Sequence, residues 1–195
     1  MVSKSNIVVL GAGKSGIGAG VLAKKNGANV LVSDFDQISQ DNQKILNNYN
    51  ISWEENGHDE VAVLNADLVV KSPGISDSNS LIKKLDQKGI PVISEIELAA
   101  RYCKGKKICI TGSNGKTTTT LMISYLLQNA GFKSKAVGNI GESYALSVAI
   151  DPVDYYVIEL SSFQLDRMYE FKADIAIVLN ITPDHLDRYE NQFSK

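Results

Sequence analysis

The sequence predicts an α/β protein built on two successive parallel sheets, and three observations carry this prediction. Short apolar runs alternate with segments of helical spacing along the chain, as in parallel sheets whose strands are buried on both faces. A glycine-rich turn follows the first apolar run at 11–16, and a second one follows the run at 108–110. The turns predict a Rossmann-like parallel-sheet N-terminal domain at residues 1–104, then the first part of a P-loop ATPase α/β domain at residues 105–195.

The first hundred residues carry strand and helix signals in regular alternation. Strands are expected at 7–10, 30–33, 51–54, 68–70 and 91–94, with helices near 17–25, 37–47, 79–88 and 94–103. Asn26 and Gly27 are residue types that end helices, and Ser94 and Glu97 have the spacing of a capping box. One βαβ series is therefore complete before the lysine-rich segment at 104–107.

A second βαβ series begins after that segment, which we interpret as the boundary between the two domains. Its strands are expected at 108–110, 135–137, 155–160 and 175–179, with a helix that runs from the second glycine-rich turn to about Gly131. No strand closes the second sheet, and the chain stops near the start of a predicted helix. We therefore expect the sequence to be the N-terminal part of a longer protein.

The composition excludes several functional classes. Of the 195 residues, 44% are apolar, as in an ordinary globular protein, and the formal net charge of −2 does not favour a nucleic-acid or anionic-membrane partner. Cys103 and Cys109 fit neither a zinc pattern nor a disulfide framework and are expected to be reduced thiols. The N-terminus has no long apolar segment, so we expect a cytoplasmic protein without membrane insertion.

The turn Thr111-Gly-Ser-Asn-Gly-Lys-Thr117 predicts an ATP phosphate loop. Its glycines let backbone N–H groups surround phosphate oxygens, and the following helix N-terminus adds partial positive charge. Lys116 supplies a full charge to the β- and γ-phosphates, and the Thr117 hydroxyl can bind Mg²⁺. The general pattern has a glycine six residues before the lysine, where this chain has Ile110. The alternative, a turn that only caps a helix, accounts poorly for the four threonines at 117–120.

The first turn, Gly11-Ala-Gly-Lys-Ser-Gly16, matches the G-x-G-x-x-G pattern, and Asp34 ends the next strand. By itself this pattern predicts a site for a dinucleotide or another diphosphate, with Asp34 near a ribose. The alternative is close packing of strand and helix without a ligand. Ser72, Pro73 and Gly74 end another parallel strand, where ligands collect, although the tripeptide alone is more typical of a simple turn.

Acidic and imidazole groups follow two of the later strands. Glu159 lies at the end of an apolar run, in the position of a carboxylate directed at Mg²⁺ beside a phosphate loop; the alternative is a structural ion pair. Asp184, His185 and Asp187 follow the last strand, where a second divalent ion could be held. The other histidine, His58, lies in a polar stretch and is expected to be solvated.

These motifs together resemble the Mur ligases, the ATP-dependent amide-forming enzymes of peptidoglycan precursor synthesis. The run 110–117 is similar to the phosphate loop of this family, in which the first P-loop glycine is replaced. Segments 138–141, 159–165 and 180–189 resemble the branch that adds D-glutamate to UDP-N-acetylmuramoyl-L-alanine. The resemblance spans the whole chain and implies that the Rossmann-like domain holds a UDP-sugar and no nicotinamide cofactor.

The resemblance also implies roles for individual residues. ATP would be bound by Gly112, Ser113, Asn114, Gly115, Lys116, Thr117 and Thr118, and the UDP-sugar by Lys14, Ser15, Asp34, Ser72, Pro73, Gly74, Asn139, Ser161, Gln164 and His185. Lys116, Glu159 and His185 would be catalytic, and Thr117, Glu159 and His185 would bind two Mg²⁺ ions in the complete enzyme. Relatives often carry a basic residue shortly after the position of Asp34, where this chain has Phe35 and Asp36.

The implied reaction joins UDP-N-acetylmuramoyl-L-alanine to D-glutamate and is driven by ATP. The substrate carboxylate attacks the γ-phosphate to give an acyl phosphate, and the amine of D-glutamate then displaces phosphate. The resemblance places a metal-bridging lysine and the D-glutamate site beyond Lys195, so the chain alone is expected to be an inactive monomer. The alternatives are an NAD-dependent dehydrogenase, which leaves the phosphate loop unexplained, and a non-catalytic nucleotide-binding module.

Overall fold

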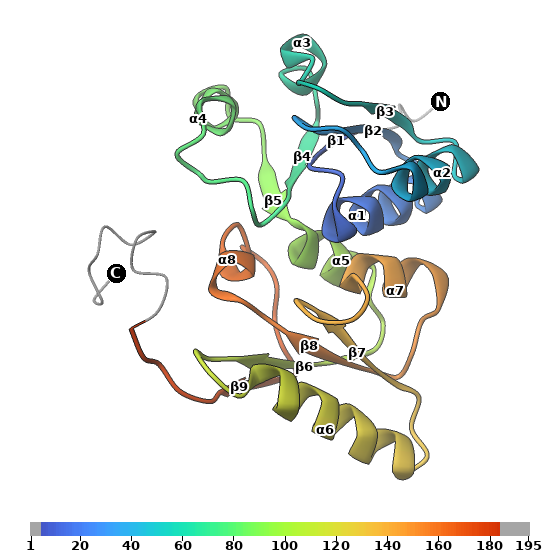
Figure 1. Ribbon diagram of the computed structural model, residues 1–195, viewed down its shortest axis with the longest axis vertical. Coiled ribbons are helices and arrows are strands. Elements are labelled where there is room, and N and C mark those ends of the chain that lie inside the picture. Colours follow the sequence, from blue (N-terminus) through green and yellow to red (C-terminus); the bar gives the residue numbers. More distant parts are fainter. Residues whose placement is uncertain (1–4, 184–195) are drawn as a thin grey trace.

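The computed structural model describes residues 5–183, which form two parallel sheets (Figure 1). The first sheet has the strand order β3-β2-β1-β4-β5, and the second has the order β7-β8-β6-β9. The first comprises β1 (Asn6–Leu10), β2 (Asn29–Ser33), β3 (Ser52–Glu54), β4 (Leu68–Lys71) and β5 (Val92–Ser94). The second comprises β6 (Lys106–Thr111), β7 (Ser134–Gly138), β8 (Tyr155–Glu159) and β9 (Ile175–Val178). All neighbouring strands pair in parallel, which confirms the predicted α/β class.

Eight helices lie among the described residues. They are α1 (Lys14–Lys25), α2 (Gln40–Asn48), α3 (Glu60–Val63), α4 (Ser80–Gln87), α5 (Glu95–Tyr102), α6 (Lys116–Asn129), α7 (Tyr144–Ile150) and α8 (Ser162–Leu165). Helices α3, α7 and α8 were not expected from the sequence, because helices of four to seven residues are too short to show a helical repeat. None of the helices in the described part is long and apolar enough to cross a membrane.

Side chains of β1 alternate between two apolar cores. Ile7 and Val9 belong to a cluster that includes residues of α1, α2 and α5, whereas Val8 and Leu10 belong to a cluster with α3 and α4. Successive side chains of a strand point to opposite faces, so helices cover both faces of the first sheet (Figure 1). This arrangement confirms that the continuous apolar runs are strands buried on both sides.

A layer of helices formed by α1, α5 and α7 lies between the two sheets (Figure 1). The apolar cluster that contains Val9 of the first sheet also contains Ile158 of β8 (Tyr155–Glu159) in the second sheet. Tyr144 of α7 packs edge-on against Tyr156 of β8, with their ring centroids 5.2 Å apart. One hydrophobic core thus serves both sheets, and the division of the chain into two domains at residue 104 stays a prediction.

Glycine on α1 allows that helix to approach α7 closely. A Cβ atom added at Gly18 would overlap the side chain of Ser143 and would lie 2.9 Å from the backbone nitrogen of Leu146. Two lysines of α1 also reach the second half, because Lys14 Nζ donates to the Gly141 carbonyl and Lys25 Nζ to the Ala149 carbonyl, both at 2.6 Å. Close backbone approach and these hydrogen bonds hold the two halves together.

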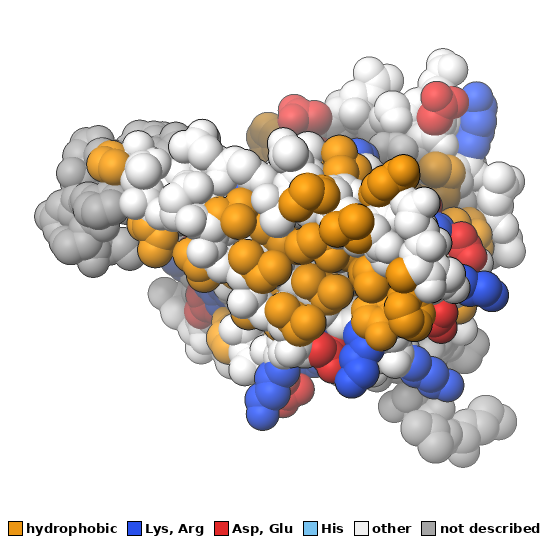
Figure 2. Space-filling model, turned by 90° about the horizontal axis from the view of Figure 1, so that it is seen from below, with side chains coloured by type: hydrophobic (Ala, Val, Ile, Leu, Met, Phe, Trp, Pro, Cys, Tyr) orange, Lys and Arg blue, Asp and Glu red, His pale blue; other side chains and the backbone are white. Residues whose placement is uncertain are grey.

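The outer face of α6 is apolar and exposed. Figure 2, which views the molecule from the α6 side, shows hydrophobic side chains gathered over this face. Its exposed apolar residues on α6 and β9 are Leu121, Met122, Tyr125, Leu126, Ile175 and Val178. A contiguous apolar surface of this kind is typical of a face that packs against further protein.

Candidate functional site

The phosphate loop connects the end of β6 to the start of α6. Gly112 and Gly115 have φ angles of +141° and +85°, which favour glycine, and Gly115 is the N-cap of α6. Lys116 folds back over the loop, where its Nζ donates to the carbonyls of Gly112 at 2.6 Å and Ser113 at 3.0 Å. The sequence therefore builds the predicted strand, turn and helix, with an ammonium group directly over the turn.

Residues 180–182 hold the phosphate loop from outside. The side-chain amide of Asn180 donates to the Asn114 carbonyl and accepts from the Asn114 N–H, both at 2.9 Å. The Ser113 hydroxyl donates to the Thr182 carbonyl at 3.0 Å and accepts from the Thr182 N–H at 2.9 Å. This confirms that the segment after the last strand lies beside the loop. Asp184, His185 and Asp187 lie outside the described residues.

Glu159 lies next to the phosphate loop, at the end of β8. Its side chain is only 1% exposed, and its Oε2 accepts from the Thr117 hydroxyl at 2.8 Å. Its Oε1 accepts from Nδ2 of Asn139 at 2.7 Å. Strand β8 pairs with β6, so the carboxylate and the first turn of α6 meet at the carboxyl ends of adjacent strands. The structure thus brings together Thr117, Asn139 and Glu159, which the sequence analysis had selected from three separate motifs.

The pair of Thr117 and Glu159 has oxygen groups suited to Mg²⁺. Magnesium binds through one or two carboxylates, keeps several waters and takes further oxygens from phosphates, so it does not need a cage made of protein alone. Within residues 5–183, no group of three or more histidine, cysteine or acidic side chains that could hold a metal lies together. A metal bound here would therefore depend on nucleotide oxygens as well as on this pair.

A groove of about 560 Å³ lies along the carboxyl ends of the first sheet. It is lined by Gly11 and Gly13 of the first glycine turn, by Asp34 and by Ser72. Asp34 accepts from the Ala12 N–H at 2.5 Å, so its carboxylate fixes the glycine turn. The structure therefore places two segments that were predicted to bind a nucleotide in one groove.

The third glycine of the first turn has a packing role. A Cβ atom added at Gly16 would overlap the carbonyl group of Gly11, so α1 can follow β1 this closely only with glycine at that position. Lys14 begins α1, and its ammonium group is bonded to Gly141 of the second half. Its predicted approach to a diphosphate stays a prediction.

His58 is partly buried, so the expectation that it is solvated was wrong. Its Nδ1 lies 2.6 Å from the Ser33 hydroxyl, which also donates to Oε1 of Glu54 at 2.5 Å. The His58 ring lines the groove, with its centroid 6.2 Å from the ring centroid of Phe35. Phe35 is 72% exposed at the same groove. Two aromatic rings, of Phe35 and His58, therefore line the groove next to Asp34.

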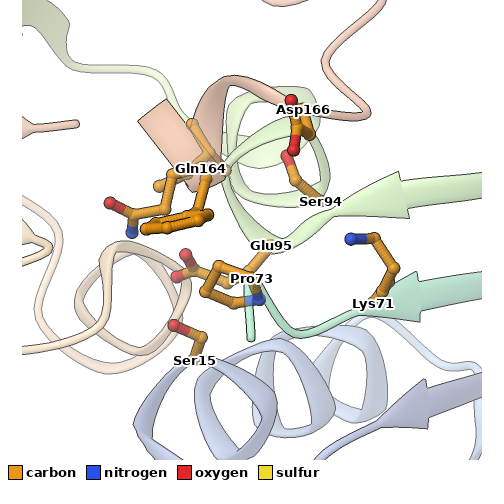
Figure 3. Close-up of a pocket in the computed structure, with 9 residues that line it drawn as sticks. Ser15, Lys71, Pro73, Ser94, Glu95, Gln164 and Asp166 are labelled. Atoms are coloured by element: carbon orange, nitrogen blue, oxygen red, sulfur yellow. The ribbon is translucent and has the colours of Figure 1, made fainter. Parts of the chain in front are cut away.

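A second, smaller cavity of about 10 Å³ lies at the junction of the two halves (Figure 3). It is large enough for about one water molecule. Ser15 and Pro73 line it from the first half, and Gln164 of α8 lines it from the second half. Gln164 is also held locally, because its Oε1 accepts from the N–H and the hydroxyl of Ser161 at 3.1 and 3.2 Å. Three predicted UDP-sugar residues thus meet at this junction.

Gly74 and Thr118 lie beside these features. Gly74 follows Pro73, and a Cβ atom added to it would meet nothing within 4 Å. Thr118 is exposed in the first turn of α6. Their predicted contacts with the UDP-sugar and with ATP stay predictions.

Glu95 also lines the junction cavity, and the sequence analysis did not identify it. Its side chain is buried, and its Oε1 accepts from the Ser143 hydroxyl at 2.7 Å and from the Ala145 N–H at 2.6 Å. Burial raises the pKa of Glu95, and the hydrogen bonds from Ala145 and Ser143 oppose that rise. The carboxyl group thereby fixes the start of α7 to the start of α5.

The predicted capping box at the start of α5 is only half formed. The Ser94 hydroxyl accepts from the Glu97 N–H at 3.1 Å, as expected. The Glu97 carboxylate, however, turns away from Ser94 and accepts from the N–H groups of residues 169–171 at 2.9 to 3.2 Å. A tertiary contact therefore replaces the local one.

Lys71 is a second charged residue of the junction that was not predicted from the sequence. It ends β4, is 3% exposed and lines the same cavity. Its sequence signal is the one that identified Glu159, a charged residue at the end of an apolar strand. Glu95 follows a strand directly and carries a weaker signal. Arg167, which pairs with Asp77 and Asp86, lies in an irregular segment whose sequence gives no indication of these partners.

Comparison with family models gives two matches. Residues 6–81 match the MurD N-terminal domain, and residues 110–193 match the Mur ligase middle domain. Curated relatives include the UDP-N-acetylmuramoylalanine--D-glutamate ligases of Bacteroides fragilis, 57% identical over 95% of this chain, and of Porphyromonas gingivalis, 53% identical over 97%. The chain spans 42% of the length of each of these relatives.

Solved structures with a similar fold are also Mur-type ligases. UDP-N-acetylmuramate:L-alanyl-gamma-D-glutamyl-meso-diaminopimelate ligase from Neisseria meningitides aligns with a TM-score of 0.64 and 21% identity, over 96% of this chain and 64% of that one. UDP-N-acetylmuramate-alanine ligase from Thermotoga maritima aligns with a TM-score of 0.61 and 23% identity, over 97% of this chain and 44% of that one. At this level of identity the two alignments support the fold alone.

Proposed function

The chain belongs to the Mur ligase family, and we propose that it binds UDP-N-acetylmuramoyl-L-alanine and ATP for the addition of D-glutamate. The observation that carries this proposal is the contact of Glu159 with Thr117 and Asn139 beside the phosphate loop. A buried carboxylate at that position has a use in phosphoryl transfer and little use in nucleotide binding alone. ATP as a substrate also favours action in the cytoplasm.

The first-half groove is the proposed site for the nucleotide part of the UDP-sugar. Its glycine turn exposes backbone N–H groups at the N-terminus of α1, a favourable place for a diphosphate. The groove leads toward Ser72 and Pro73, and Pro73 lines the junction cavity with Ser15 and Gln164. We place the sugar and its alanine in this direction, toward the second half.

The phosphate loop is the proposed ATP site. Lys116 would exchange its contacts with loop carbonyls for the β- and γ-phosphates, and the backbone N–H groups of residues 112–115 would surround the phosphate oxygens. Thr117 and Glu159 would hold Mg²⁺, which screens negative charge on the transferring phosphoryl group when it is bound. Asn139 would keep the Glu159 carboxylate in place by its hydrogen bond.

The proposed chemistry has two steps. An oxygen of the alanine carboxylate bonds to the γ-phosphorus, and the bond from that phosphorus to ADP breaks. The D-glutamate amine then attacks the acyl carbon, and phosphate leaves as the amide forms and a proton is lost. In the first step two anions approach each other, so Lys116 lowers the barrier by placing positive charge where negative charge gathers.

Replacement of Glu159 by glutamine in the full-length protein tests the proposal. The amide keeps the size of the side chain but removes the charge, so turnover should fall by about 10² to 10³-fold. Turnover is measured as ADP release that depends on both UDP-N-acetylmuramoyl-L-alanine and D-glutamate. Glu142→Gln, which changes a partly exposed carboxylate paired with Lys135, serves as the matched control and should keep wild-type turnover.

Wild-type turnover in Glu159→Gln would contradict the role proposed for Glu159. A wild-type protein without ADP release that depends on both substrates would contradict the ligase proposal and favour a nucleotide-binding module. The dehydrogenase alternative is tested separately by ligand-induced shifts of the melting temperature. A ligand at 100 times its Kd stabilises the folded state by about 2.7 kcal/mol, so UDP-N-acetylmuramoyl-L-alanine should raise the melting temperature and NAD should not. A rise in the melting temperature with NAD but not with UDP-N-acetylmuramoyl-L-alanine would favour the dehydrogenase instead.

A further inference from the structure

A short segment after α8 is fastened to the first half of the chain by charged groups. We call residues 166–171 the strap. The strap follows α8, which carries Gln164 at the junction cavity, and it leads toward β9 of the second sheet. Its attachment therefore decides where Gln164 lies relative to the nucleotide groove.

Arg167 joins the strap to two carboxylates of the first half. Its Nε donates to Oδ2 of Asp77 at 3.1 Å, and its Nη1 and Nη2 donate to the two oxygens of Asp86 at 2.7 and 2.8 Å. The Arg167 side chain is 13% exposed, so water screens these pairs less than it screens surface pairs. The hydrogen bonds from Arg167 lower the pKa of Asp86. The two parallel hydrogen bonds to Asp86 fix both the distance and the orientation of the strap relative to α4.

The backbone of the strap is held as firmly as the arginine side chain. Arg167 has a φ angle of +59°, which is uncommon for a residue other than glycine and persists only where the surroundings impose it. Its carbonyl accepts from the Ser94 N–H at 3.0 Å. The buried carboxylate of Glu97 accepts from the three N–H groups of residues 169–171. Groups of the first half thus bind the strap on several sides.

Lys71 also holds the groove wall, through one carboxylate that it shares with the strap and through a backbone carbonyl. Its Nζ lies 3.2 Å from Oδ1 of Asp77 and donates to the Ile75 carbonyl at 2.6 Å. Ile75 lines the nucleotide groove, whereas the Lys71 side chain lies at the junction cavity below the segment that carries Asp166 (Figure 3). Loss of the Arg167 side chain would therefore remove the attachment of the strap to Asp77 and Asp86 and leave the groove wall attached to Lys71.

We propose that Arg167 is a positioning residue for the sugar end of the UDP-sugar. By attaching the strap to Asp77 and Asp86, it holds Gln164 opposite Pro73, so that a ligand leaving the groove meets both walls of the junction. The inference rests on the proposed function, since it assumes that a UDP-sugar is the ligand. UDP lacks the sugar and the alanine, so we expect it to bind in the groove without reaching the strap, and its affinity should not depend on Arg167.

Binding of two ligands to the 195-residue chain tests this inference. We expect Arg167→Ala to weaken binding of UDP-N-acetylmuramoyl-L-alanine about 10-fold, which corresponds to about 1.4 kcal/mol, and to change the Kd of UDP by less than about 2-fold. Arg167→Lys keeps the charge but loses the bidentate contact with Asp86, and its loss should be intermediate. Lys44→Ala removes an exposed ion pair with Asp41 and is the matched control, with both affinities unchanged.

The two ligands separate a positioning role from a general loss of stability. Equal weakening of both ligands in Arg167→Ala and Arg167→Lys would mean that the arginine only stabilises the fold, and unchanged binding of both would mean that it does not position the junction. Either result overturns the inference and leaves the proposed function intact. A wild-type chain that does not bind UDP-N-acetylmuramoyl-L-alanine would instead contradict the proposed function, and the inference with it. Arg167→Lys keeps the test open if Arg167→Ala does not fold.

Discussion

The phosphate loop and the junction between the two halves both contain buried or partly buried charged groups, but they are assembled in different ways. In the loop, Lys116 binds carbonyls three and four residues away, and Glu159 comes from the strand adjacent to β6. At the junction, Glu95 binds groups 48 and 50 residues away, and Arg167 binds carboxylates 81 and 90 residues away. The contacts of Lys116 are therefore local, whereas those of Glu95 and Arg167 join distant segments.

This difference separates the groups that we propose to act on a ligand from the groups that align the two halves. The loop presents an ammonium group, backbone N–H groups and a carboxylate at strand ends, where a nucleotide can reach them. The junction uses its charged groups on each other and on backbone atoms, so they fix α7, the strap and the groove wall. Substitutions should therefore affect chemistry in the first region and stability or alignment in the second.

Lys116→Ala should have the largest effect, and the effect should be on chemistry. Without the ammonium group the developing phosphoryl charge is not screened, so turnover of the full-length protein should fall by about 10³-fold. The free energy of unfolding should change by less than about 1 kcal/mol, because the carbonyls that Lys116 contacts lie in an accessible loop. ADP release and urea denaturation measure the two quantities. A large loss of stability in Lys116→Ala would contradict the view that the loop serves chemistry and the junction serves stability. Lys83→Ala, on the exposed side of α4, is the control.

Gly18→Ala should have the largest effect on stability at the junction. The added methyl group overlaps Ser143 at the start of α7, and such overpacking costs about 1 to 3 kcal/mol. Urea denaturation of the 195-residue chain measures the loss. Gly13→Ala is the matched control, because a Cβ atom there meets nothing within 4 Å and the φ angle of −74° suits alanine. If both variants were equally stable, α1 and α7 would not be in close contact in solution.

Glu95→Gln should have a smaller effect that depends on pH. Because burial raises the pKa of Glu95, the folded state keeps this proton at pH values where the unfolded state has lost it. The Glu95 carboxyl group therefore makes its full contribution to stability below its pKa in the unfolded chain, about 4.3. That contribution is lost as the pH rises through its pKa in the folded protein. The glutamine variant lacks this loss, so its stability relative to wild type should increase from pH 4 to pH 7. Parallel pH profiles for the two proteins, with Glu170→Gln as an exposed control, would argue against a buried carboxyl at the junction.

Much of the fold and the phosphate site could be predicted from the sequence because their signals are local. Apolar runs such as Ile7 to Leu10 become strands buried on both faces, and the turn at 111–117 connects a strand to a helix. Glu159 was found because a charged residue at the end of an apolar strand needs a partner. The short helix α7 was not found, since its seven residues show no repeat and its start depends on a contact with Glu95.

The sequence by itself determined the α/β class, the two glycine turns and the side chains of and beside the phosphate loop, because each depends on neighbours in the chain or on the end of an adjacent strand. Only the tertiary structure decided that α7 and α1 share a core, that Glu97 turns away from its own helix start, and that Arg167 fastens the strap to Asp77 and Asp86. The physical reason is that a charged side chain specifies the kind of partner it needs but not which one. The packing of distant segments makes that choice.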